Sequence, residues 1–123
     1  MLEVYSLDAS VGATAVIPLN NVIIQKGCTA VNSAPATIQL NKCGVYCVSC
    51  NASSTDAITI EMYKNGVEQP QTQVTGTSVA FTTLVQVDKD NCDCPCSSPT
   101  MLQFFNIGDA ATLDINVTVT KVV

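Results

Sequence analysis

The chain has 123 residues, nearly half of them hydrophobic, which favours one domain with one packed core over disorder. Its net charge is −5, and with five lysines and no arginine it cannot form the basic stripe that nucleic-acid binding needs. It has no histidine, which excludes Ser-His-Asp and Cys-His catalysis and imidazole metal ligands, so we expect no enzyme.

The chain begins without the basic region and the hydrophobic region of a signal peptide, so we expect synthesis in a cytoplasm. Its longest apolar runs are only a few residues, and we expect no membrane-spanning segment.

Apolar and polar residues then alternate, which is the pattern of half-buried β-strands. Residues 14–24 predict one or two short strands broken at Pro18, and Asn65-Gly66 predicts a tight hairpin turn into a return strand near 67–72. The residues expected to face the core in four further strands are Ile38, Leu40, Tyr46, Val48, Cys50, Ile58, Ile60, Met62, Leu113, Ile115, Val117 and Val119.

Residues 78–87 and 100–107 predict two more strands, separated by a polar loop at 88–99 that ends at a proline. No stretch has a helical period of useful length, and turn residues recur about every ten positions. These features predict an all-β fold, an antiparallel β-sandwich or barrel.

The order of these motifs resembles the trimeric jelly roll of the tumour-necrosis-factor and complement-globular-head superfamily, in its bacterial and phage members. The resemblance covers about residues 14–122 and implies a jelly-roll domain over 14–123, with residues 1–13 as an N-terminal arm or anchor. It rests on a G-x-Y strand, an NG hairpin and a closing N-x-G turn and strand, matched here by Gly44, Tyr46, Asn65, Gly66, Asn106, Gly108 and Leu113.

The resemblance also implies a homotrimer, in which one sheet face of each copy packs around a three-fold axis. Apolar residues occupy both faces of the 100–107 strand, although the core needs only one of them. A second apolar pair lies on the expected outward side of the strand after Gly44. The interface candidates are therefore Val45, Cys47, Phe104, Phe105 and Ile107.

The seven cysteines are an odd number, so at least one is free or pairs between chains. Cys92, Cys94 and Cys96 are candidate zinc ligands, but a fourth ligand has to come from elsewhere. The C-x-x-C at Cys47 and Cys50 lies in a strand, which places the two thiols on opposite faces. We favour a disulfide from the 92–96 loop to Cys43 or Cys47, so the disulfide candidates are Cys43, Cys47, Cys92, Cys94 and Cys96.

A second metal hypothesis comes from the aspartates of the 88–99 loop. Asp88, Asp90, Asn91 and Asp93 resemble a sparse calcium-binding run, although the glycine and the final glutamate of an EF-hand are missing. A solvated acidic loop explains the same residues, and we expect no cofactor.

The main functional hypothesis is a non-enzymatic structural protein, a capsid-decoration or head-fibre module displayed on a phage virion and made in the cytoplasm of a bacterial host. Its partners are then other copies of itself and a capsid protein, contacted through the N-terminal residues. The alternative is a head domain that binds a glycan or a host surface. A third possibility is an interaction module stabilised by metal or thiols, as on a spore surface.

Overall fold

The computed structural model describes residues 1–27, 29–33, 36–87 and 100–122, and the side chains of all of these except 30–33. The predicted loop 88–99 therefore lies outside the described residues. The strands are β1 (Leu2–Val11), β2 (Ala15–Val16), β3 (Asn21–Gln25), β4 (Thr29–Ser33), β5 (Ala36–Leu40), β6 (Gly44–Lys64), β7 (Val67–Glu68), β8 (Val74–Val87), β9 (Thr100–Asn106) and β10 (Ala111–Lys121). One 3₁₀ helix, η1 (Pro70–Thr72), accompanies them, and none of the described residues forms an α-helix.

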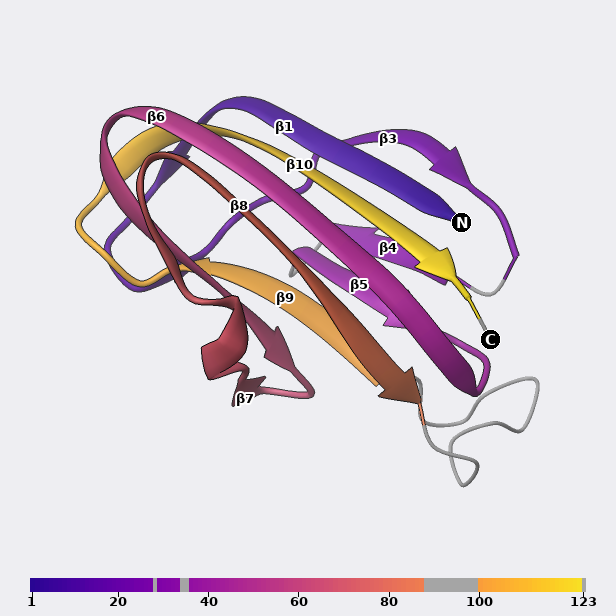
Figure 1. Cartoon of the computed structure of the whole chain (residues 1–123). Helices are drawn as coiled ribbons and strands as arrows, with labels where there is room; N and C mark the ends of the chain where they lie inside the picture. The colour runs from indigo at the N-terminus through magenta and orange to yellow at the C-terminus, as the bar shows by residue number, and fades with distance from the viewer. Residues whose placement is uncertain (28, 34–35, 88–99, 123) are drawn as a thin grey trace.

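The strands form two layers joined by the long strands β6 and β8, which both continue from one layer into the other (Figure 1). In the first sheet the order is β3–β1–β10–β6–β8, with the first half of β6 paired to β10 and β8. In the second sheet the order is β4–β5–β9–β6–β8, with the second half of β6 paired to β9 and to the start of β8. All pairs are antiparallel, and the predicted β-sandwich of the jelly-roll type is confirmed.

The core lies between the two sheets and contains the inward residues of both. Each of the core-facing residues predicted from the alternation is at most 2% exposed. The rings of Phe81 on β8 and Phe104 on β9 stack across the core with 6.2 Å between their centroids. Burial of these alternate side chains is the main force that holds the sheets together.

The structure corrects the prediction that residues 1–13 form an arm or anchor. Residues 2–11 form β1, which lies inside the first sheet between β10 and β3, and Leu2 and Val4 are fully buried. A bulge between Ser6 and Ala9 interrupts the register with β10, and Asp8 has a positive φ of 51° there. The segment is therefore an integral strand of the sandwich.

The Asn65-Gly66 turn is confirmed by its backbone, since both residues have positive φ, 51° and 79°. Such a turn favours asparagine and glycine because they tolerate that conformation. Asn65 is also fixed to β9, because its Oδ1 accepts the Met101 N–H at 2.8 Å. The return strand is shorter than predicted, because Pro70 begins η1 after only the two residues of β7.

Two of the family motifs have a clear structural purpose. The Tyr46 ring is fully buried, and its hydroxyl donates to the Lys42 carbonyl at 2.8 Å. The buried Asn106 side chain donates to the Asp109 carbonyl at 2.8 Å and accepts the Gly108 N–H at 3.2 Å, so it shapes the turn into β10. Within the described residues, no helix is long and apolar enough to cross a membrane.

Candidate functional site

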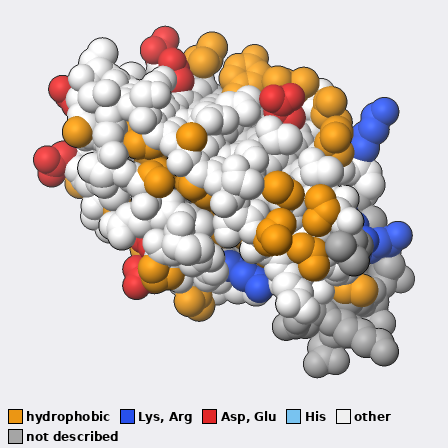
Figure 2. Space-filling model, viewed as in Figure 1, with side chains coloured by type: hydrophobic (Ala, Val, Ile, Leu, Met, Phe, Trp, Pro, Cys, Tyr) orange, Lys and Arg blue, Asp and Glu red, His pale blue; other side chains and the backbone are white. Residues whose placement is uncertain are grey.

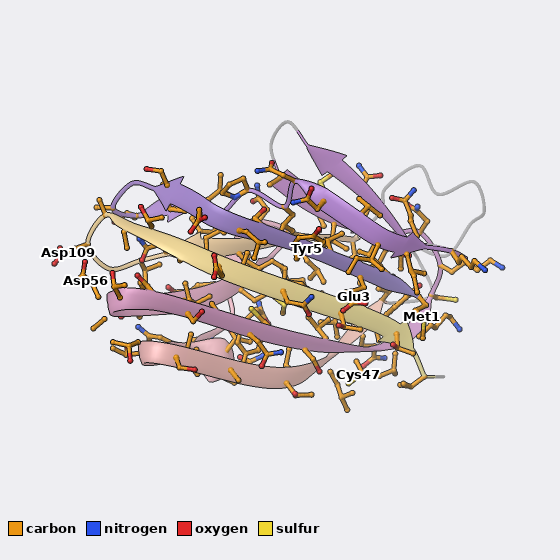
Figure 3. The ribbon with its side chains drawn as sticks, turned by 90° about the horizontal axis from the view of Figure 1, so that it is seen from above. Met1, Glu3, Tyr5, Cys47, Asp56 and Asp109 are labelled. Atoms are coloured by element: carbon orange, nitrogen blue, oxygen red, sulfur yellow. The ribbon has the colours of Figure 1, made fainter. Side chains whose placement is uncertain are left out.

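The outward face of the first sheet carries a row of side chains from four strands. The register places Tyr5 opposite Asn116, Asn116 opposite Asn51, and Asn51 opposite Ala80. Figure 3 looks down on this face, with Glu3 and Tyr5 along β1 and Cys47 toward the end where Met1 lies. Residues far apart in the sequence therefore form one continuous surface.

Hydrogen bonds between neighbouring strands connect the polar groups of this face. The Asn116 amide donates to Glu3 Oε2 at 3.2 Å, and the Ser49 and Thr82 hydroxyls lie 3.2 Å apart. At the bulge, the Asp8 N–H donates to Asp114 Oδ1 at 2.8 Å. The centre of the face is thus polar, and it includes the carboxylates of Glu3 and Asp114.

A groove of about 500 Å³ crosses this polar surface. Tyr5, Leu7 and Ile23 line it at the β1 and β3 side. The Asp114 carboxylate and amide, hydroxyl and aliphatic side chains from β6, β8 and β10 line the rest. Leu7 and Ile23 are 64% and 54% exposed, so the groove has an apolar edge open to solvent. Leu84, on the opposite edge of the same sheet, is also 64% exposed. The face therefore combines exposed apolar groups with groups that can form hydrogen bonds.

The five predicted interface residues do not share one surface. Val45 and Cys47 lie half-buried on the first sheet's outward side, and Cys47 is opposite Leu84 in the register. Phe105 and Ile107 are half-buried and alternate with the buried residues of β9, on the second sheet's outward side. Phe104 is fully buried in the core, so it cannot contact another copy, and that candidate is corrected.

The cysteines that the structure describes have different environments. Cys50 is 2% exposed in the core, where burial raises the pKa of its thiol to about 12. Cys47 is half-buried and also a free thiol, so the structure does not support it as a disulfide anchor. Cys43 is disulfide-bonded. The loop cysteines Cys92, Cys94 and Cys96 lie outside the described residues, so a bond between them and Cys43 stays a prediction.

No group of three or more Asp, Glu, Cys or His side chains suited to a metal occurs in the part of the chain that the structure describes. The predicted zinc ligands Cys92, Cys94 and Cys96 and the predicted calcium run at 88–93 both fall outside that part. Neither hypothesis is tested.

The second sheet's outward face holds a carboxyl group that the sequence interpretation did not single out. Glu61 is only 3% exposed, although it alternates with the core residues Ile60 and Met62 and so lies on the outward side. It is opposite Phe105 in the register, and the rings of Phe105 and Tyr63 have centroids 4.4 Å apart. Burial, and then the charge of Glu68, raise the pKa of Glu61.

Sequence reasoning also missed Tyr5 and Leu7, because it assigned their segment to an arm. The alternation of Leu2, Val4 and Ser6 was the signal available for a strand there. For Glu61 no local signal exists, because its aromatic neighbour Phe105 comes from a different strand.

Comparisons with known proteins show which solved structures have a similar fold. No protein-family model and no curated protein matches the sequence. The globular domain of zebrafish complement 1qA protein matches in structure with a TM-score of 0.75 and 10% identity, over 99% of this chain and 96% of that one. The PRD1 vertex protein P5 matches with a TM-score of 0.68 and 14% identity, again over 99% and 96%. Rabbit GITRL matches with a TM-score of 0.54 and 10% identity, over 98% and 94%.

These likenesses extend over nearly the whole of each chain, at identities that show the fold alone. The chain therefore has the jelly-roll fold of the tumour-necrosis-factor and complement globular heads, in agreement with the resemblance found in its sequence motifs.

Proposed function

We propose that this protein is a non-enzymatic structural module that assembles as a homotrimer and is displayed on a virion surface as a capsid-decoration or head-fibre protein. The proposed self-association rests on one observation, the polar and apolar composition of the outward face of the first sheet. The likeness of the fold to the PRD1 vertex protein P5 supports the placement on a capsid.

The chemistry of the first face fits contact with other copies of the chain. The core of a protein interface is poor in charged residues and rich in aromatic groups, and Tyr5, Asn51 and Asn116 occupy the centre here. A cyclic trimer joins two different patches of each copy. The groove edge at Leu7 and Ile23 and the exposed Leu84 lie on opposite sides of one sheet and provide such a pair.

The mass of the particle in solution tests this assembly. Native mass spectrometry at micromolar concentration is expected to give the mass of three chains. Asn51→Arg places a charged side chain at the centre of the face and is expected to give single chains. Gln71→Arg, an equally exposed site on η1, is the matched control and is expected to keep the trimer. A wild-type protein that stays monomeric contradicts the proposal.

The proposed location needs its own experiment. Virus particles are purified from host cells that produce the chain, and the proteins of the particles are identified by mass spectrometry. A labelled antibody against the chain then locates it on the particles. We expect the chain on the outside of intact particles. Its absence from purified particles contradicts the location and leaves the trimer untouched.

A glycan- or host-surface-binding head is the second candidate, favoured by the groove itself. A tyrosine ring beside asparagine and aspartate side chains is a combination that sugar-binding sites use. A glycan array with wild type and Tyr5→Ala tests it. If the intact trimer binds a glycan and Tyr5→Ala abolishes that binding, the result favours this candidate. The same result contradicts a trimer interface that covers the groove.

A further inference from the structure

The Glu61 residue is almost enclosed, yet its carboxyl group has no partner among the residues that the structure describes. It accepts no hydrogen bond and forms no ion pair, and the described residues contain no fully enclosed side-chain oxygen without a partner. The Glu61 oxygens therefore retain contact with solvent at the surface of the second sheet.

An unpaired carboxylate in such a position is unfavourable, because burial removes water without supplying a compensating charge. Its charged neighbour is Glu68, which is opposite Tyr63 in the register and adds a second negative charge. The described lysine on the same strand, Lys64, donates instead to the Gln86 carbonyl at 2.8 Å. The local field therefore favours a cation supplied from outside the chain.

We propose that Glu61, Tyr63 and Phe105 form a recognition site for an arginine side chain of a partner protein. A guanidinium group is planar and weakly hydrated, so it can stack on an aromatic ring while it donates two hydrogen bonds to a carboxylate. The ammonium group of lysine is more strongly hydrated and loses more on entering such a site. Glu68, exposed at the rim, adds to the attraction.

The partner is not another copy of this chain, because the chain contains no arginine. The site also lies on the second sheet, so it remains open when the first sheet packs against other copies. The inference thus goes beyond the proposed trimer and does not depend on it.

Titration of the full-length protein with methylguanidinium at constant ionic strength tests the site. Two-dimensional NMR is expected to show saturable shifts of the amide signals of Glu61, Tyr63 and Phe105, with weaker effects from methylammonium. Glu61→Gln is expected to weaken binding about tenfold, the effect of losing one charge-assisted contact. Asp8→Asn removes the same charge at an exposed position of β1, in the other sheet, and is expected to leave the affinity unchanged.

Two further measurements make the result decisive. Phe105→Leu keeps the carboxylate and removes one ring, so it is expected to weaken methylguanidinium more than methylammonium. The mass of the assembly is recorded on the same samples, which separates failure of this site from failure of the trimer. Equal weakening by Glu61→Gln and Asp8→Asn, or the absence of saturable shifts in the wild type, overturns the proposal.

Discussion

The two outward faces of the sandwich differ in whether their polar side chains have hydrogen-bond partners. On the first sheet the amides and hydroxyls bond to each other, as Asn116 does to Glu3 and Ser49 to Thr82. On the second sheet the tilted rings of Tyr63 and Phe105 lie beside the carboxyl of Glu61, which has no hydrogen-bond or ion-pair partner among the described residues. A face whose polar groups bond to each other can meet an identical copy without specific charges, whereas a mostly enclosed carboxylate without a protein partner favours a cationic partner.

The charges are also unevenly distributed along the molecule. In the face shown in Figure 2, carboxylates lie mostly toward one end and lysines toward the other. Asp56 and Asp109 lie at the end opposite Met1 and the labelled Cys47 (Figure 3). The charges of the described residues are therefore unevenly distributed along this face of the molecule.

The largest expected effect is on the free energy of unfolding, and it distinguishes two neighbouring residues of β9 whose side chains point to opposite faces. Phe104→Ala leaves a cavity in the core that both sheets share, and we expect it to lower the free energy of unfolding by about 3–5 kcal/mol. Phe105→Ala removes a half-buried ring and is expected to cost about 1 kcal/mol. Urea unfolding of both variants checks this, and equal losses would show that the two faces of β9 are not distinct.

The second effect compares the two free thiols of β6. In the monomeric Asn51→Arg variant, iodoacetamide is expected to modify Cys47 about a hundredfold faster than Cys50, whose thiol is buried with a raised pKa. In the trimer, Cys47 is expected to react more slowly, because the first face is covered. Peptide mapping by mass spectrometry measures both rates, and modification of Cys50 as fast as Cys47 in the folded protein would contradict the assigned faces.

A smaller effect on stability is expected from the charge of Glu61 on the outward face of the second sheet. The pKa of Glu61 is raised in the folded state, so its ionised form disfavours folding. Glu61→Gln and the wild type are expected to differ least below the ordinary pKa of 4.5, where the carboxyl is protonated in both states. As the pH rises through the raised pKa, the wild type should lose stability relative to Glu61→Gln.

Urea midpoints of both proteins, measured from acidic to mildly basic pH at one protein concentration, test this sign. Taking their difference removes the contribution of groups that both proteins contain and that do not interact with Glu61. A difference that shrinks as the pH rises would contradict the assigned environment of Glu61.

The smallest effect is expected on the first face. Ser49→Ala removes one exposed hydroxyl bond to Thr82, which water replaces, so the stability of the protomer should change by at most about 0.5 kcal/mol. Thermal unfolding of Ser49→Ala in the Asn51→Arg background measures this without the trimer. A loss comparable with that of Phe104→Ala would mean that the hydroxyl row holds the sheet together.

Local pattern predicted much of the fold and little of the candidate sites. Alternation identified the inward side of β10 at Leu113, Ile115 and Val117, because neighbouring side chains in a strand point to opposite faces. It left Phe104 and Phe105 both open as interface residues, because both are apolar. The bulge near Asp8 interrupts the alternation in β1, so the local pattern does not predict that strand over its full length.

The sequence by itself determined most of the strands, though not β1 or β4, together with their inward residues and the Asn65-Gly66 turn. Each of these depends on residues within a few positions of one another. Only the tertiary structure decided that Tyr5, Asn116 and Asn51 share one surface and that Glu61 lies beside Phe105. Those neighbours come from strands distant in the chain, and their register is set by packing of the whole core. Both proposed sites are therefore products of strand pairing.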